Sequence, residues 1–161
     1  MDRVLTDLLS HPLFDSRSSS YIRWYPKTLK PVLGISFQAD ETPRPTGVYI
    51  HVPFCDQICS FCPFNKLRTE PHLVDLFHKA LKEEIALYGK VAWPTPLQFI
   101  YFGGGTPSVL SPGQLEAILS SLDMHFGICT DAEITLEAHP RHLNRQAAKE
   151  LFACGINRVS S

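Results

Sequence analysis

Leu97-Gln-Phe-Ile-Tyr-Phe102 runs directly into Gly103-Gly-Gly-Thr-Pro107, and this stretch of sequence decides the fold class. The first six residues are nearly all apolar, a composition typical of a parallel strand that is buried on both faces. The three glycines tolerate a positive φ and also allow another group to approach the backbone closely. The stretch therefore predicts a central parallel strand followed by a loop built either for a tight turn or for close contact with a ligand.

Strand and helix signals alternate on both sides of this stretch. An earlier unit has a strand over Val48–Val52 and a helix whose apolar residues recur at helical spacing between Leu73 and Tyr88. After the glycines, Ser111-Pro-Gly-Gln114 supplies the N-cap residue, the first-turn proline and the glutamine of a capping box. This segment predicts the start of a second helix.

A third unit has a strand over residues 133–138 and a helix that Asn144 caps and Gly155 terminates. Residues 156–160 have the composition of the start of a fourth strand. Strands and helices that alternate in this way form a parallel sheet with right-handed crossovers. We therefore expect an α/β fold, the N-terminal portion of a (β/α) partial TIM barrel, with the pattern truncated in the fourth strand.

The composition of the 161 residues bounds the function. Residues 1–46 contain scattered prolines and a serine-rich turn, and we expect them to form a leader that packs on a core formed by residues 47–161. Fifteen basic and sixteen acidic residues give a net charge of −1 without a basic run, so nucleic acid is not an expected partner. No signal peptide and no run of about 20 apolar residues occurs, so we expect a cytoplasmic protein without a membrane span.

Three cysteines follow the first predicted strand in a Cys-x3-Cys-x2-Cys run, namely Cys55, Cys59 and Cys62. Three thiolates on one loop suit an iron–sulfur cluster that keeps one iron open to a small molecule. A structural zinc site completed by His51 is an alternative. An odd number of cysteines without a secretory signal argues against a disulfide framework.

The cysteine run, the glycine loop and the end of the third strand follow successive parallel strands, so they meet at the rim where barrel enzymes hold their active sites. The motifs are Tyr49-Ile-His-Val-Pro-Phe-Cys55 with Cys59-Ser-Phe-Cys62, then Gly103-Gly-Gly-Thr-Pro-Ser108, then Ile134-Thr-Leu-Glu137. Together they resemble the radical S-adenosylmethionine (SAM) superfamily and, within it, the oxygen-independent coproporphyrinogen III oxidase-like group. The resemblance covers about residues 47–161.

The resemblance implies a [4Fe–4S] cluster held by the three cysteines, with SAM bound at the open iron and a second SAM in several relatives. An electron from a donor such as flavodoxin or ferredoxin would cleave SAM to methionine and a 5′-deoxyadenosyl radical. That radical would abstract hydrogen from a porphyrin-like or other conjugated small molecule. The resemblance identifies no catalytic residue that acts on the substrate. It does imply, by position, that the following residues contact SAM: Tyr49, Phe61, Gly104, Gly105, Thr106 and Glu137.

Some of these contacts have a simpler interpretation. The resemblance implies that Tyr49 would contact the cofactors through its side chain and Phe61 through its backbone or by packing on adenine, but both aromatics would also suit a core. The Glu137 carboxylate suits the ammonium group of SAM, but it could instead pair with Arg141 or Arg158.

The segment after the third cysteine departs from the family pattern. Cys62 is followed by Pro63-Phe64, where coproporphyrinogen oxidases of this group have Gly-Cys. The departure places porphyrinogen decarboxylation in doubt and leaves haem chaperones, haem-degrading methyltransferases and radical methylases or cyclopropanases as alternatives. Haem chaperones often have Cys-Asp-Phe here, which favours an enzyme, either a radical SAM oxidoreductase or a methyltransferase. His139, where relatives often have Asn or Asp, is a second departure, and for His51 we expect a structural hydrogen bond.

Overall fold

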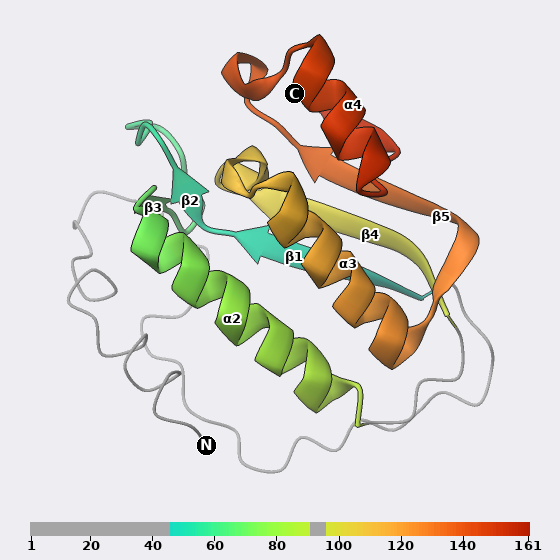
Figure 1. Cartoon of the computed structure of the whole chain (residues 1–161). Coiled ribbons are helices and arrows are strands. Elements are labelled where there is room, and N and C mark those ends of the chain that lie inside the picture. Colours follow the sequence, from blue (N-terminus) through green and yellow to red (C-terminus); the bar gives the residue numbers. More distant parts are fainter. Residues whose placement is uncertain (1–45, 91–95) are drawn as a thin grey trace. The chain divides into compact units, whose positions relative to one another are not determined.

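The computed structural model describes residues 46–90 and 96–161 of the chain. Within this part, four strands form one parallel sheet in the order β1-β4-β5-β6 (Figure 1). Their bounds are Thr46–Val52 for β1, Leu97–Gly104 for β4, Ile128–Glu137 for β5 and Arg158–Ser160 for β6. The predicted α/β class and parallel sheet are confirmed. The predicted leader, residues 1–46, lies outside the described residues except for its last residue, which opens β1.

Three helices carry the chain between these strands. Helix α2 spans Pro71–Tyr88, α3 spans Pro112–Phe126 and α4 spans Arg145–Ala153. Helices α2 and α3 run side by side (Figure 1). The apolar core lies between these helices and the sheet, and its most deeply buried side chains are Val52, Leu97, Ile100, Phe102, Leu115, Ile118, Leu122 and Leu136.

The helix ends follow the capping signals of the sequence. Ser111 and Gln114 form the predicted capping box of α3, because the Ser111 Oγ accepts the backbone N–H of Gln114 and the Gln114 Oε1 accepts that of Ser111. The Asn144 side chain accepts two backbone N–H groups in the first turn of α4. Gly155 follows α4 with a φ of 106°, a conformation that favours glycine.

Strand β5 begins earlier than predicted, at Ile128 instead of Glu133. Its pairing with β4 is irregular, since Leu97 pairs with Ile128 whereas Phe99 pairs with Glu133. The extra residues on β5 form a bulge, which interrupts the alternation of apolar and polar residues. Residues 128–132 therefore lack the alternating pattern that predicts a strand.

Short elements surround the carboxyl ends of the main strands. Strands β2 (Phe54–Cys55) and β3 (Leu67–Arg68) form a second, two-stranded parallel sheet. The short 3₁₀ helix η2 (Pro107–Val109) follows β4, and η3 (Pro140–His142) follows β5. The loops that carry the sequence motifs thus leave the sheet at one edge. No helix within residues 46–90 and 96–161 is long and apolar enough to cross a membrane.

Candidate cofactor site at the carboxyl ends of the strands

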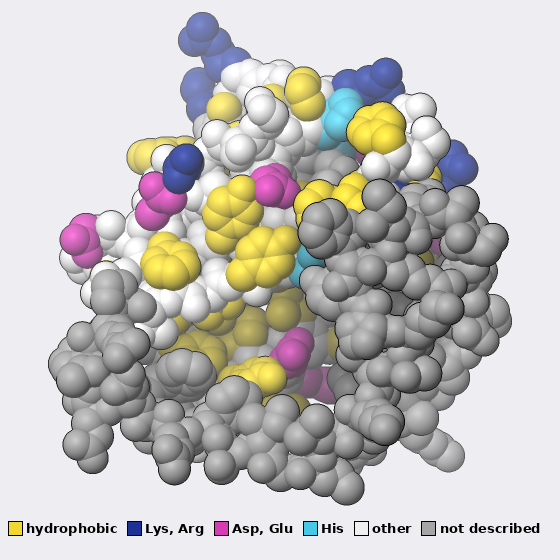
Figure 2. Space-filling view, turned by 180° about the vertical axis from the view of Figure 1, so that it is seen from behind, with side chains coloured by type: hydrophobic (Ala, Val, Ile, Leu, Met, Phe, Trp, Pro, Cys, Tyr) yellow, Lys and Arg dark blue, Asp and Glu magenta, His cyan; other side chains and the backbone are white. Residues whose placement is uncertain are grey.

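The sheet face opposite the apolar core carries aromatic and polar side chains. Tyr49 pairs with Tyr101 across β1 and β4, and their rings stack with centroids 5.9 Å apart. Thr135 of β5 pairs with Tyr101, so Glu137, two residues further on, lies on the same face. Figure 2 views the molecule from this side and shows hydrophobic, acidic and histidine side chains next to one another.

The Glu137 carboxylate is fixed against β4. Its Oε1 accepts a hydrogen bond from the Tyr101 hydroxyl at 2.8 Å, and its Oε2 accepts one from the backbone N–H of Gly104 at 3.1 Å. The hydrogen bond to Glu137 raises the pKa of Tyr101, because a phenolate would lose that bond and repel the carboxylate. Arg158, one of the two arginines offered as a partner of Glu137, instead pairs with Glu133 at 2.7 Å. The alternative interpretation, in which Glu137 forms an ion pair with Arg158, is therefore wrong.

The glycine loop at the end of β4 packs against the chain around the first cysteine. Gly104 has a φ of 115°, and a Cβ there would lie 2.8 Å from the His51 ring. A Cβ on Gly105 would lie 2.6 Å from the carbonyl oxygen of Phe54 and 2.9 Å from the Cys55 Sγ. Gly104 thus has the positive φ predicted for a tight turn, and Gly105 allows the segment before Cys55 to approach the loop closely. Close contact of the glycines with a ligand stays a prediction.

Two backbone hydrogen bonds hold this contact in register. The N–H of Gly105 donates to the carbonyl of Val52 at 2.8 Å, and the N–H of Thr106 donates to the carbonyl of Phe54 at 2.7 Å. The loop after β4 is therefore joined to the segment that carries Cys55.

The cysteine loop, residues Cys55 to Lys66, is anchored at both ends. The N–H of Thr69 donates to the carbonyl of Cys55 at 3.0 Å, and the N–H of Leu67 donates to the carbonyl of Pro53 at 2.6 Å. Within the loop, the Lys66 Nζ donates to the carbonyl of Cys62. Cys55 is buried, with 8% of its surface exposed, whereas Cys59 is exposed and Cys62 is half-buried, and all three are free thiols.

The three thiols are not gathered around a common point. Within residues 46–90 and 96–161, no group of three or more His, Cys, Asp and Glu side chains is placed to hold a metal ion. The structure therefore brings Cys55 to the glycine loop but does not assemble the three thiols into one ligand set.

His51 makes the structural hydrogen bonds expected of it. Its Nε2 lies 3.0 Å from the carbonyl oxygen of Asn65, and its Nδ1 lies 3.3 Å from the Tyr49 hydroxyl. The neutral ring with its proton on Nε2 satisfies both contacts, since it donates to the carbonyl and accepts from the hydroxyl. Both nitrogens are thus engaged, which argues against His51 as the fourth ligand of a zinc site.

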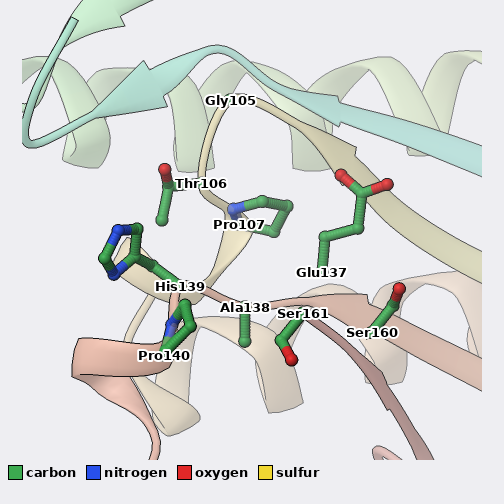
Figure 3. A pocket seen from close by; sticks show the side chains of 9 residues that line it. All are labelled: Gly105, Thr106, Pro107, Glu137, Ala138, His139, Pro140, Ser160 and Ser161. Atoms are coloured by element: carbon green, nitrogen blue, oxygen red, sulfur yellow. The ribbon is translucent and has the colours of Figure 1, made fainter. Parts of the chain in front are cut away.

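A pocket of about 320 Å³ lies beside the glycine loop, and three of the predicted SAM contacts line it (Figure 3). In Figure 3 the Glu137 side chain extends towards the ribbon near Gly105. The residues that line the pocket are Gly105, Thr106, Pro107, Glu137, Ala138, His139, Pro140, Ser160 and Ser161.

The other predicted contacts lie outside this pocket. Gly104 does not line the pocket, but its backbone N–H donates a hydrogen bond to Glu137, which does. Tyr49 lies on the open sheet face, stacked on Tyr101. Phe61 lies in the cysteine loop with 86% of its surface exposed, so the interpretation of Phe61 as a core residue is wrong.

Sequence reasoning missed a hydrogen-bonded chain at the same rim. Ser108, His142 and Asp56 come from three separate loops and are joined through the imidazole ring of His142. Asp56 follows the first cysteine and Ser108 follows the glycine loop, so their positions beside motifs were the available signal. No spacing pattern connects either residue to His142.

The chain is similar to known proteins over most of the described part. The profile of the Radical SAM superfamily matches residues 49–160. Among curated relatives, the oxygen-independent coproporphyrinogen III oxidase of Salmonella typhimurium is 36% identical over 73% of this chain and 26% of its own length. The heme chaperone HemW of Bacillus subtilis is 38% identical over 71% of this chain and 30% of its own length.

A solved structure shares the fold. Coproporphyrinogen III oxidase (HemN) from Escherichia coli, described as a radical SAM enzyme, matches with a TM-score of 0.67 and 34% sequence identity. The match covers 72% of this chain and 27% of that protein. The chain spans about a quarter of the length of the relatives that it matches. Its motifs, its parallel sheet and the superfamily profile agree, and the chain belongs to the radical SAM superfamily.

Proposed function

We propose that Cys55, Cys59 and Cys62 bind a [4Fe–4S] cluster, that the pocket beside the glycine loop binds SAM, and that the protein is a radical SAM enzyme. The observation that carries this proposal is the position of the glycine loop between Cys55 and Glu137. Gly105 packs against the Cys55 sulfur, and the neighbouring Gly104 donates to the Glu137 carboxylate. A ligand in the pocket would therefore contact the carboxylate beside the first thiol.

The residues present fit a cluster held by three thiolates. The three cysteines are free, and their loop is anchored at its ends with an exposed thiol in the middle. His51, the nearby candidate for a fourth protein ligand, has both ring nitrogens hydrogen-bonded. A donor set of three thiolates leaves one iron of a [4Fe–4S] cluster open to a small molecule.

When bound, the cluster and SAM supply reductive cleavage of SAM to a 5′-deoxyadenosyl radical, with the electron coming from a flavodoxin or ferredoxin. The chain's own residues bind and orient the cofactor. The Glu137 carboxylate would accept hydrogen bonds from the SAM ammonium group, while Tyr101 keeps it in place. We assign further SAM contacts to Thr106 beside Glu137, to Tyr49 on the sheet face and to Phe61 in the cysteine loop.

The proposed substrate is a porphyrin-like or other conjugated small molecule. The names of the relatives support it, because they include coproporphyrinogen III oxidases and heme chaperones. A haem chaperone is the second candidate function, favoured by 39% identity to the heme chaperone HemW of Synechocystis. Pro63 after the third cysteine departs from both patterns and leaves a radical SAM methyltransferase or cyclopropanase as a further alternative.

Anaerobic reconstitution with iron and sulfide tests the cofactor assignment. We expect a [4Fe–4S]⁺ electron paramagnetic resonance (EPR) signal after reduction that shifts when SAM is added. Alanine at Cys55, Cys59 or Cys62 should each abolish the cluster. The matched controls Cys129→Ser and Cys154→Ser should retain it, and full iron and sulfide content in any of the three alanine variants would refute the assignment.

Release of deoxyadenosine separates the two functions. An enzyme should release it when coproporphyrinogen or another conjugated substrate is added to the reduced, SAM-loaded protein. A chaperone should instead bind haem with a shifted Soret band and release no deoxyadenosine above the background without substrate.

A further inference from the structure

Three side chains that the proposed cofactor contacts do not use form a hydrogen-bonded chain across the rim. The Ser108 Oγ lies 2.8 Å from the His142 Nδ1, and the His142 Nε2 lies 2.9 Å from the Asp56 Oδ2. Asp56 belongs to the cysteine loop, Ser108 to η2 after β4, and His142 to η3 after β5. The imidazole ring of His142 therefore joins three parts of the rim: the cysteine loop, the segment after β4 and the segment after β5.

The direction of these hydrogen bonds is consistent along the whole chain. The backbone N–H of His139 donates to the Ser108 Oγ at 3.1 Å, which leaves the hydroxyl proton of Ser108 for the His142 Nδ1. A neutral His142 with its proton on Nε2 then donates to the Asp56 carboxylate. One tautomer of His142 thus satisfies both of its hydrogen bonds, and the His142 side chain is only 26% exposed.

Asp56 also lies near Thr69, the residue that follows β3. Its pKa lies below the usual value, chiefly through the Thr69 hydroxyl and then through His142. The Thr69 hydroxyl is buried and has no partner of good hydrogen-bond geometry, so the 2.9 Å contact with His142 is the better formed of the two. Asp56, the residue after Cys55, is thus held by the hydrogen bond from His142 of η3.

A nucleophilic role for Ser108 is disfavoured by the geometry. In Ser-His-Asp hydrolases the serine bonds the Nε2 of the histidine and the carboxylate bonds the Nδ1. Here the serine lies on Nδ1 and the carboxylate on Nε2. The Ser108 oxygen also accepts a backbone N–H, which engages one of its lone pairs.

We propose that His142 and Ser108 are positioning residues that clamp Asp56, and with it the start of the cysteine loop, to the loops after β4 and β5. The glycine loop already holds the chain on the other side of Cys55, through Gly105 and Thr106. The clamp therefore fixes the direction in which the cysteine loop leaves the sheet. Its value for cluster binding rests on the proposed function, whereas the clamp itself is a property of the cluster-free chain.

Alkylation of Cys55 in the cluster-free protein tests the clamp directly. Cys55 is buried, so iodoacetamide reaches it only when the loop opens, and mass spectrometry after digestion reports its rate. His142→Ala should raise the Cys55 rate about fivefold to tenfold, as expected for the loss of one hydrogen bond of ordinary strength. His142→Gln should stay near the wild-type rate, because its amide can donate to Asp56 and accept from Ser108.

A matched control and an internal reference isolate the effect. His72→Ala removes a histidine whose side chain is 71% exposed and which lies 3.7 Å from a glutamate on the surface, and it should leave the Cys55 rate unchanged. Cys154 is the C-cap of α4, at the opposite end of that helix from η3, and should react at the wild-type rate in every variant. Should His142→Ala fail to fold, Ser108→Ala and Asp56→Ala take its place, and each should also raise the Cys55 rate.

The outcomes separate the clamp from the proposed function. An unchanged Cys55 rate in His142→Ala, or an equal rise at Cys154, would overturn the clamp. Labelling of Ser108 by a fluorophosphonate would replace it with a nucleophilic role. In reconstituted protein, His142→Ala should lose iron to a chelator faster than His72→Ala. Failure of the wild type to form a cluster would refute the proposed function and leave the alkylation result to decide the clamp.

Discussion

Replacement of Gly105 by alanine tests the contact on which the proposed site depends. The new Cβ would lie 2.6 Å and 3.0 Å from the carbonyl oxygens of Phe54 and Val52, and 2.9 Å from the Cys55 Sγ. Two of these three atoms belong to the backbone, so a side-chain rotation cannot relieve the clash. The loop after β4 would have to recede by about 0.8 Å to reach ordinary van der Waals distance.

The cost of this movement has two parts. Overpacking of a well-packed site costs about 1–3 kcal/mol. The movement also stretches the bonds from Gly105 N to Val52 O and from Thr106 N to Phe54 O, and each such bond contributes about 0.5–1.5 kcal/mol. We expect Gly105→Ala to lower the free energy of unfolding by about 2–4 kcal/mol, which corresponds to a urea midpoint lower by about 1–2 M.

Gly113→Ala is the matched control for this measurement. Gly113 lies in the first turn of α3, has no atom within 4 Å of an added Cβ and has no positive φ. Alanine there should raise the free energy of unfolding by about 0.5–1 kcal/mol, since it lowers the entropy of the unfolded chain. The reasoning is refuted if urea unfolding, followed by circular dichroism, gives Gly105→Ala the same midpoint as the wild type or a higher one.

Two further predictions concern the ends of β4 and α3. Removing the charge in Glu137→Gln should return the raised pKa of Tyr101 towards its usual value, measured by ultraviolet difference titration against Tyr101→Phe; no change in the titration would contradict the assigned hydrogen bond. Because the folded state raises this pKa, its contribution to stability is complete below the pKa of an unfolded tyrosine and is lost as the pH rises through the folded value. Ser111→Ala should cost about 1 kcal/mol in the same urea assay, because it removes the cap of Gln114, whereas an unchanged midpoint would show that the capping box contributes nothing to stability.

The features predicted from the sequence depend on neighbouring residues in the chain. The capping box at Ser111, the Asn144 cap and the glycine loop are local signals, and each lies where expected. Exposure of Phe61 was not predictable, because an apolar residue gives no sign that its loop is held only at the ends. The contact between Asp56 and His142 joins residues 86 positions apart, and only the packing of two rim loops creates it.

The three thiols differ in how far they are exposed, and this difference suggests how the cysteine loop would close on the proposed cluster. Cys55 is fixed by a strand on one side and by the clamp on the other, whereas Cys59 is exposed. The other end of the loop is held where His51 approaches the carbonyl of Asn65 and the N–H of Leu67 donates to the carbonyl of Pro53. When the cluster binds, only the middle of the loop then has to become ordered, which limits the conformational entropy lost on binding. The anchors at both ends should therefore raise the affinity for the cluster without contacting it, since they order in advance the chain that its ligands must share.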